Sequence, residues 1–313
     1  MLTSSHLDLL KSVSRSFYLS IRFLPPAMRE PVALGYLLAR LTDTIADAAA
    51  LERQNRIDCL GAVRQVILNP EERHADSLPD LSAAISHEGE RELFWRHAEL
   101  FEWYRETDEK NRSHLYEVIL TIIQGQSWDI TYFKEGEWTA TETGDDLLRY
   151  TYWVAGCVGE FWTKVGFTTL GEKFASPDDA SSMLVQGRKL GQGLQLINIL
   201  RDLHEDLPNH RCYLPADELR EAGWDGVSLP SIEELAPVFE TWLGQCESFL
   251  DLTDPYSRKI VNQRAAFCTR LPMSLAQKTA KALRSAGVER VVTEKIKIPR
   301  SEVWKSMLKV WLC

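Results

Sequence analysis

The sequence predicts an all-α fold in a single domain over residues 1–313. Apolar residues recur at the spacing of amphipathic helices along most of the chain, which is the main signal of helical structure. No series of short alternating strands occurs, and no internal repeat of roughly 20 to 50 residues is visible. The 313 residues suffice for a large core, and 44% hydrophobic with 26% charged residues is the composition of an ordinary globular protein.

Net charge and cysteine usage limit which functions and which cellular compartment are expected. A net charge of −9 and a pI near 5.4 argue against a nucleic-acid binder, which normally carries a basic field. The six cysteines are scattered without a Cys-x-x-Cys pair, as expected for reduced thiols in a cytoplasmic protein. The N-terminus lacks a signal-peptide core, and no uncharged apolar run reaches the roughly 18 residues of a membrane span. Peripheral membrane contact is left open for the amphipathic end over 303–313, which could equally pack on its own core.

Prolines mark the end of the first predicted helix and the start of the second. Residues 7–23 are predicted to form one helix, with Ser-Arg-Ser-Phe near its middle, ended by Pro25 and Pro26. The second begins near Glu30 and Pro31, since proline suits the first turn, and continues to about residue 52. After Pro208 a loop and then a short helix are expected. Further helices are expected over 57–68, 81–106, 113–133, 145–170, 180–206, 230–251 and 255–284.

The second of these helices carries carboxylates on one face. Tyr36, Arg40, Asp43 and Asp47 recur at spacings of four, three and four residues, so they line a single stripe. A lone Asp-x-x-x-Asp is often only a solvated face. This one follows an apolar run and lies among alanines, where a solvated face is less natural.

A second carboxylate face lies in the run Gly191–Asp206. Asn198, Asp202 and Asp206 stand four residues apart, while apolar residues cover most of the remaining helix surface. A helix buried on nearly all sides must compensate its carboxylates, because an unpaired buried charge is very costly. A divalent cation or Arg201 would supply that compensation.

Two such faces together predict metal and phosphate chemistry. If the helices face each other across a cavity, their carboxylates can bind Mg²⁺, which prefers oxygen ligands and commonly takes the remaining ones from substrate phosphates. Arginine suits bidentate phosphate contacts, so a diphosphate clamp would be completed by Arg15, Arg40, Arg201 and Arg211. With the diphosphate at the mouth of an apolar cavity and its hydrocarbon chain inside, loss of the diphosphate would leave an allylic carbocation. In the alternative reading the same arginines merely pair with the aspartates, and both readings can hold when metal is absent.

These motifs resemble those of the squalene and phytoene synthases, which are head-to-head prenyltransferases of the isoprenoid synthase fold. The resemblance covers nearly the whole chain and rests on five motifs in the same order. They are SRSF at 14–17, YLLARLTDTIAD at 36–47, YTYWVAGCVGE at 150–160, LQLINILRDLHED at 194–206 and RCYLP at 211–215. Each is weak alone, but five in order are specific. The resemblance implies a helical bundle around a central apolar cavity.

The resemblance also assigns roles by matching position, with two molecules of farnesyl diphosphate as substrates. The residues expected to bind Mg²⁺ are Asp43, Asp47, Asn198, Asp202 and Asp206. The residues expected to contact the diphosphates are Ser14, Arg15, Ser16, Tyr36, Arg40, Asn198, Arg201 and Arg211. Tyr150 resembles the tyrosine assigned to proton handling or cation stabilisation, although a core tyrosine would look the same. Phe267 resembles an aromatic residue of the second half-reaction pocket, where a ring face stabilises a cation.

The tail bears on the final product. In the family, squalene synthases reduce presqualene diphosphate with NADPH, whereas related enzymes release hydroxysqualene, dehydrosqualene or phytoene without it. The stretch 294–303 resembles the basic segment implicated in NADPH binding, which makes Lys295, Lys297 and Arg300 candidates for the cofactor's phosphates. A basic loop before a surface helix is the alternative. We therefore expect a squalene synthase that uses Mg²⁺ and NADPH.

The sequence departs from the family pattern at two places, and two other classes of protein are alternatives. Ala46 stands where many eukaryotic squalene synthases have a glutamate, so the first motif has one carboxylate fewer. The chain ends at Cys313 without the hydrophobic anchor of the eukaryotic enzymes, as expected of a soluble, bacterial-type enzyme. An inactive helical scaffold, in which arginines simply pair with the aspartates, predicts no diphosphate release. A terpene cyclase is disfavoured because the second motif lacks the Asn/Asp, Ser/Thr, Glu pattern of cyclases.

Overall fold

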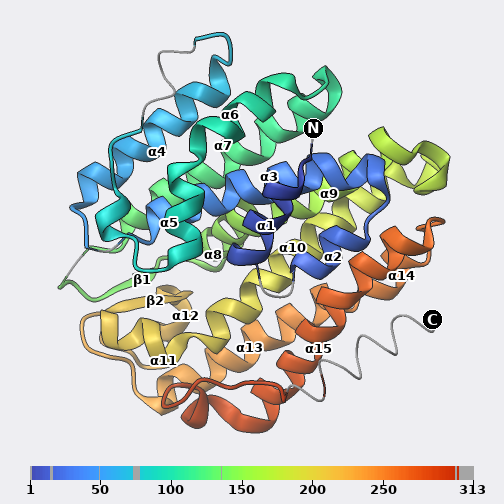
Figure 1. Ribbon diagram of the computed structural model, residues 1–313. Helices are drawn as coiled ribbons and strands as arrows, with labels where there is room; N and C mark the ends of the chain where they lie inside the picture. The colour runs from blue at the N-terminus through green and yellow to red at the C-terminus, as the bar shows by residue number, and fades with distance from the viewer. Residues whose placement is uncertain are drawn as a thin grey trace. The chain divides into compact units, whose positions relative to one another are not determined.

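Figure 1 shows the computed structural model of the chain, which describes residues 2–14, 17–48, 50–72, 78–134, 136–299 and 302. Helices make up most of these residues, and among them only two short strands occur. The predicted all-α fold is therefore confirmed. No helix within the described ranges combines the length and the apolar character needed to cross a membrane.

The chain forms two compact units, each built from two separate stretches of sequence. The first unit comprises Met1–Thr131 and Phe161–Pro177, and the second comprises Tyr132–Glu160 and Asp178–Cys313. Helices α7 (Glu109–Tyr132) and α9 (Cys157–Leu170) contain points at which the chain passes from one unit to the other. Neither unit is a continuous piece of chain, and the single domain over residues 1–313 stays a prediction.

In the first unit, α3 contacts most of the other helices. The helices that lie wholly in this unit are α1 (Ser4–Val13), α2 (Phe17–Phe23), α3 (Pro26–Ala46), α4 (Arg53–Leu68), α5 (Glu88–Trp95) and α6 (His97–Glu106). α3 packs against α1, α2, α4, α5 and α6, and it buries Leu37, Leu38 and Leu41 completely. Gly35 permits close packing on this helix, because a Cβ there would lie 2.9 Å from the ring of Phe161.

The boundaries of the first helices differ from those predicted. The chain is extended at Ser14 (φ −135°, ψ 104°), so the predicted helix over 7–23 is divided into α1 and α2. Both the amide and the hydroxyl of Ser14 donate to the Leu10 carbonyl, at 2.9 and 2.7 Å, so Ser14 caps the end of α1. α3 begins at Pro26, earlier than the predicted Glu30, because proline also suits this first position, and it ends at Ala46.

In the second unit, α10 is the element against which the others pack. Its helices and strands are β1 (Thr139–Thr141), α8 (Gly144–Thr151), a π-helical turn (Tyr152–Gly156), α10 (Ala180–Arg201), α11 (Leu203–Asp206), β2 (Arg211–Pro215), α12 (Ala216–Glu221), α13 (Ile232–Leu250), α14 (Thr253–Ser257) and α15 (Gln263–Val291). α10 contacts the π-helical turn, α13 and α15, and the three long helices run side by side in Figure 1.

Glycines allow α10 to approach the segment around the start of α9 very closely. A Cβ on Gly159 would lie 1.8 Å from the carbonyl oxygen of Gly187, and one on Gly191 would lie 2.2 Å from that of Ala155. Only residues without a side chain fit at such backbone contacts. The helix with the second aspartate motif is thereby held against the motif that contains Tyr150.

The two strands form a small parallel sheet in the second unit. Thr139 pairs with Arg211 and Ala140 with Cys212, and the Thr141 hydroxyl donates to the Tyr213 carbonyl at 2.6 Å. The loop predicted after Pro208 therefore contains an unpredicted strand, and the short helix predicted to follow it is α12. The pairing joins distant parts of the chain, and local periodicity carries no signal for it.

Candidate active site

The first aspartate motif occupies the last turns of α3. Arg40 Nη1 lies 2.7 Å from Asp43 Oδ2, and Nη2 lies 2.5 Å from Oε1 of Glu90 on α5. One guanidinium thus bridges a predicted metal ligand and a second carboxylate. The ion pair that the sequence offered as an alternative to phosphate binding is present at this motif.

Solvent reaches both carboxylates of this motif, although protein atoms crowd around them. The Asp43 side chain keeps 43% of its surface accessible, and Asp47 is exposed. Burial and, to a lesser extent, the negative charge of Asp43 raise the pKa of Asp47 to about 7. Burial also raises the pKa of Asp43, against the lowering effect of Arg40. The motif is therefore short of positive charge and open to an incoming cation.

Ser14 and Tyr36 lie together beside the first motif. The Tyr36 hydroxyl donates to the carbonyl of Val13 at 3.3 Å and also interacts with the Ser14 hydroxyl. Burial raises the pKa of Tyr36, so this phenol stays protonated. The other two predicted phosphate contacts of the SRSF motif, Arg15 and Ser16, lie outside the described residues.

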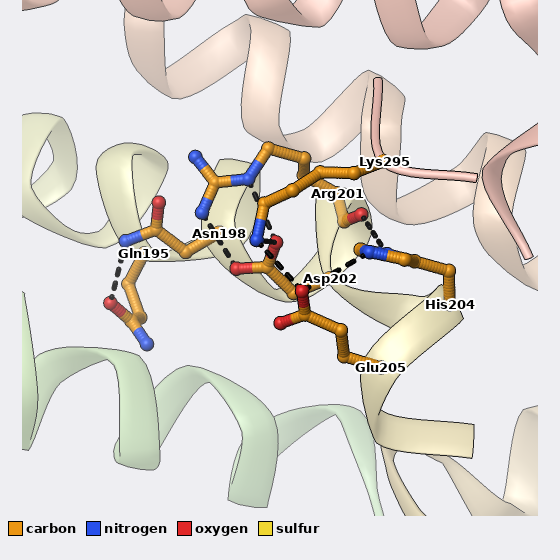
Figure 2. A network of polar contacts seen from close by, with 7 residues as sticks. All are labelled: Gln195, Asn198, Arg201, Asp202, His204, Glu205 and Lys295. Atoms are coloured by element: carbon orange, nitrogen blue, oxygen red, sulfur yellow. Dashed lines mark hydrogen bonds and ion pairs between the residues drawn. The ribbon is translucent and has the colours of Figure 1, made fainter. Parts of the chain in front are cut away.

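The second aspartate motif lies where α10 passes into α11 (Figure 2). α10 ends at Arg201, and Asp202 has a non-helical backbone (φ −94°, ψ 10°), so the predicted helix over 180–206 is divided. The Asp206 amide still donates to the Asp202 carbonyl at 2.9 Å, which preserves the four-residue step. Asn198 is exposed, and Asp202 and Asp206 are half-buried. The helix is predicted to be buried on nearly all sides. This is correct for its apolar positions and wrong for the stripe of polar residues, which solvent reaches.

Arg201 holds Asp202 through two parallel hydrogen bonds. Its Nε donates to Oδ1 at 2.8 Å and its Nη2 to Oδ2 at 2.6 Å. Burial alone would raise the pKa of Asp202, but the hydrogen bond and the charge of Arg201 lower it below its ordinary value. Arg201 is thus one source of the charge compensation predicted for this helix.

Lys295 joins the same network from the stretch that follows α15. Its Nζ lies 3.0 Å from Glu205 Oε1 and 3.4 Å from Asp202 Oδ1 (Figure 2). Lys297 is exposed, and Arg300 lies outside the described residues. Of the three residues predicted to bind NADPH, Lys295 thus contacts the second aspartate motif, and the predicted NADPH binding stays a prediction.

Tyr150, at the end of α8, belongs to an aromatic cluster. Its ring stacks on that of Tyr213 with centroids 5.0 Å apart and planes 19° apart. The guanidinium of Arg211 lies 5.0 Å from the Phe133 ring and 5.4 Å from the Tyr213 ring, and it also donates a hydrogen bond to the Tyr213 hydroxyl. Tyr150 is 7% exposed, as is Phe267 on α15. Arg211, a predicted diphosphate contact, therefore places its charge against aromatic faces.

The donor set suits Mg²⁺ bound together with phosphate. Each motif offers two accessible aspartates one helical turn apart, and carboxylate oxygens are the ligands that Mg²⁺ prefers. Among the described residues, no three His, Cys, Asp or Glu side chains are arranged to hold a metal by themselves. Mg²⁺ usually needs only one or two carboxylates, since water and substrate phosphates complete its octahedron. The residues therefore fit a Mg²⁺–diphosphate complex and not a closed protein cage.

Three acidic neighbours of these motifs were not predicted as site residues. Glu90 binds Arg40, Asp129 contributes to the raised pKa of Asp47, and Glu205 binds Lys295. Asp129 could have been found as the acid within the mostly apolar helix over 113–133. Glu90 lies in a charge-rich segment fifty positions from Arg40, and nothing local distinguishes it.

Comparison with known proteins supports the family resemblance. The family model described as squalene/phytoene synthase matches residues 10–302. The squalene synthase of Schizosaccharomyces pombe is 28% identical over 212 residues, which are 67% of this chain and 43% of that protein. The phytoene synthase of Mycobacterium bovis is 28% identical over 213 residues, covering 68% and 57%. The chain spans about half the length of these curated relatives.

A solved structure described as the complex of TcSQS with the ligand E5700 has the same fold. It superposes with a TM-score of 0.79 at 19% identity, over 97% of this chain and 84% of the other. At this identity the likeness supports the fold alone.

Proposed function

This chain belongs to the squalene/phytoene synthase family, and from that membership we propose that it is a Mg²⁺-dependent prenyltransferase. It joins two farnesyl diphosphates head to head to presqualene diphosphate and reduces this intermediate to squalene with NADPH. One observation carries the proposal: each aspartate motif pairs its first aspartate with an arginine of the same motif, Arg40 with Asp43 and Arg201 with Asp202.

These pairs are suited to exchanging partners when a substrate binds. The aspartates offer oxygens to a cation, and the arginines offer bidentate donors to a diphosphate. Without ligand the two charges satisfy each other, so neither is left unpaired in a half-buried place. Each motif would in this way bind the diphosphate of one prenyl donor.

The residues proposed to hold Mg²⁺ are Asp43, Asp47, Asp202 and Asp206, with Asn198 beside them. Bound there, Mg²⁺ would neutralise charge on the departing diphosphate. The arginines would bind the remaining phosphate oxygens, together with Ser14 and Tyr36. The residues of this chain thus orient the leaving group and stabilise it as the allylic carbon–oxygen bond breaks.

Tyr150 is proposed to handle the proton lost during cyclopropane formation. Its stack on Tyr213 restricts the ring to one plane, and the guanidinium of Arg211 places a positive charge beside that stack. The Tyr150 hydroxyl would pass this proton on to the diphosphate released in the first ionisation. Phe267 would offer a ring face to the carbocation of the second half-reaction.

A second candidate shares the first half-reaction and ends without a reductant in hydroxysqualene, dehydrosqualene or phytoene. It is favoured by the contacts of Lys295, which lie on the aspartate motif and not on a free cofactor surface. The phytoene synthase of Mycobacterium bovis also matches the chain at the same identity, 28%, as the squalene synthase of Schizosaccharomyces pombe.

A product assay separates these candidates. Purified protein is incubated with farnesyl diphosphate and Mg²⁺, with and without NADPH, and the hydrocarbon is identified. Squalene that forms only with NADPH supports the first candidate, whereas a product that is unchanged by NADPH supports the second. Absence of diphosphate release in every reaction would instead favour the inactive scaffold.

Substitutions in the second motif test the site itself. Asp202→Asn and Asp206→Asn should each abolish turnover while the circular dichroism of the helices stays unchanged. Asp254→Asn is a matched control, because that side chain is 73% exposed in an ordinary i,i+4 ion pair. Near wild-type rates in either motif variant would contradict the metal assignment. The single domain, the cytoplasmic location and the peripheral membrane contact stay predictions.

A further inference from the structure

A charge-balanced ion network joins the second aspartate motif to the stretch that follows α15. Two carboxylates, Asp202 and Glu205, meet two cations, Arg201 and Lys295 (Figure 2). Their formal charges cancel without any added ion. His204 adds a contact from its Nε2 to Glu205 at 3.3 Å.

Both oxygens of Asp202 already contact cations in this network. Oδ2 accepts from Arg201 Nη2 at 2.6 Å, while Oδ1 accepts from Arg201 Nε at 2.8 Å and lies 3.4 Å from Lys295 Nζ. A metal ion binds the same carboxylate lone pairs at much shorter range. Each carboxylate oxygen has two lone pairs, so Oδ1 with its two cationic partners is filled, and one of them must withdraw before Mg²⁺ can bind that oxygen.

Lys295 is the cation that is easier to displace. Arg201 is the sequence neighbour of Asp202 and grips it in a planar, bidentate geometry, which is the stronger kind of pair. Lys295 makes only one, longer contact with Asp202, through a flexible stem, and its shorter contact is with Glu205. It also lies in residues 293–299, which form neither helix nor strand and so can move without breaking a regular element.

We propose that Lys295 is the resident counter-cation of the second aspartate motif, and that Mg²⁺ displaces it from Oδ1 of Asp202. Lys295 then sets the Mg²⁺ affinity of the motif and couples residues 293–299 to its occupancy. This inference rests on the metal-binding role proposed above for Asp202.

Calorimetric titration with Mg²⁺ alone tests the displacement. The full chain carries Asp43→Asn and Asp47→Asn, so that the heat comes from the second motif. In this background, Lys295→Gln should bind Mg²⁺ about tenfold more tightly, because repulsion between a monovalent and a divalent cation is removed. Lys297→Gln makes the same charge change two residues away at an exposed side chain, and its affinity should stay within about twofold of the parent.

Hydrogen exchange of residues 293–299 provides a readout that does not depend on turnover. In the parent protein, Mg²⁺ should speed exchange in this stretch, because its contact with the motif is released. In Lys295→Gln, exchange should be fast from the start and insensitive to Mg²⁺.

The outcomes separate this inference from the proposed function. If Asp202→Asn abolishes Mg²⁺ binding but Lys295→Gln binds Mg²⁺ no more tightly than Lys297→Gln, the counter-cation role is wrong and the metal site stands. If Asp202→Asn binds Mg²⁺ as the parent does, or if no variant binds it, the metal site and the inference both fail.

Discussion

Replacing Gly159 with alanine should force apart the contact between α9 and α10. The added Cβ would lie 1.8 Å from the carbonyl oxygen of Gly187 and 2.5 Å from its carbonyl carbon, where atoms normally stay about 3.5 Å apart. The obstacle is backbone, so no side chain can rotate away, and the helices must separate by roughly 1.5 Å. Overpacking of this kind costs about 1–3 kcal/mol, more where the backbone has to move, against a gain of about 1 kcal/mol in helix propensity. We expect a net loss of about 2 kcal/mol.

Gly244→Ala is the matched control for this substitution. Gly244 lies inside α13 of the same unit, and its added Cβ would meet nothing within 4 Å. Alanine should therefore stabilise the protein by about 0.5–1 kcal/mol. For a chain of this size, thermal unfolding followed by circular dichroism should show Tm lower by roughly 4 °C for Gly159→Ala and higher by about 1–2 °C for Gly244→Ala. A Gly159→Ala protein as stable as the parent would refute the steric argument.

Two further predictions concern ionisable groups. Folding raises the pKa of Asp47 from 3.8 to about 7. Between pH 3.8 and about 7, Asp47 is therefore protonated in the folded chain and ionised in the unfolded chain. Without Mg²⁺ the free energy of unfolding should fall as pH rises through this window, and urea titrations of Asp47→Asn should show a flatter dependence. Glu160→Gln replaces a carboxylate that is only 13% exposed and that lies 2.5 Å from Nη2 of Arg188. Because this charged pair is lost in a largely buried place, the free energy of unfolding, measured by thermal unfolding, should fall by about 1–3 kcal/mol. Glu142→Gln is the control, because Glu142 and its partner Arg220 are 60% and 48% exposed, and the free energy of unfolding should change by less than about 0.5 kcal/mol. An equal loss of stability in Glu160→Gln and Glu142→Gln would contradict the burial argument.

The aspartate motifs could be predicted because their geometry is local. A spacing of four residues places Asp43 above Asp47 on one helical face whatever the rest of the chain does. The same rule placed Asn198, Asp202 and Asp206 on one stripe, and the step survives the break at Asp202 because the backbone hydrogen bond from Asp206 persists.

The helix breaks and the strand pair could not be predicted in the same way. Apolar periodicity runs through Ser14, where the backbone becomes extended and α1 ends. β2 depends on β1, which lies far away in sequence, so the segment over 211–215 reads locally as a loop. Close backbone contact at Gly159 likewise depends on which helix packs opposite it.

The sequence by itself determined the helical class, the faces on which the aspartates lie and the family to which the chain belongs. Tertiary structure decided which charges meet those aspartates. Arg201 is adjacent to Asp202, but Lys295 reaches the motif from ninety positions beyond Glu205, and Glu90 meets Arg40 from another helix. The reason is physical: periodicity specifies which side chains share a face of one helix, whereas an ion pair between elements depends on how those elements pack.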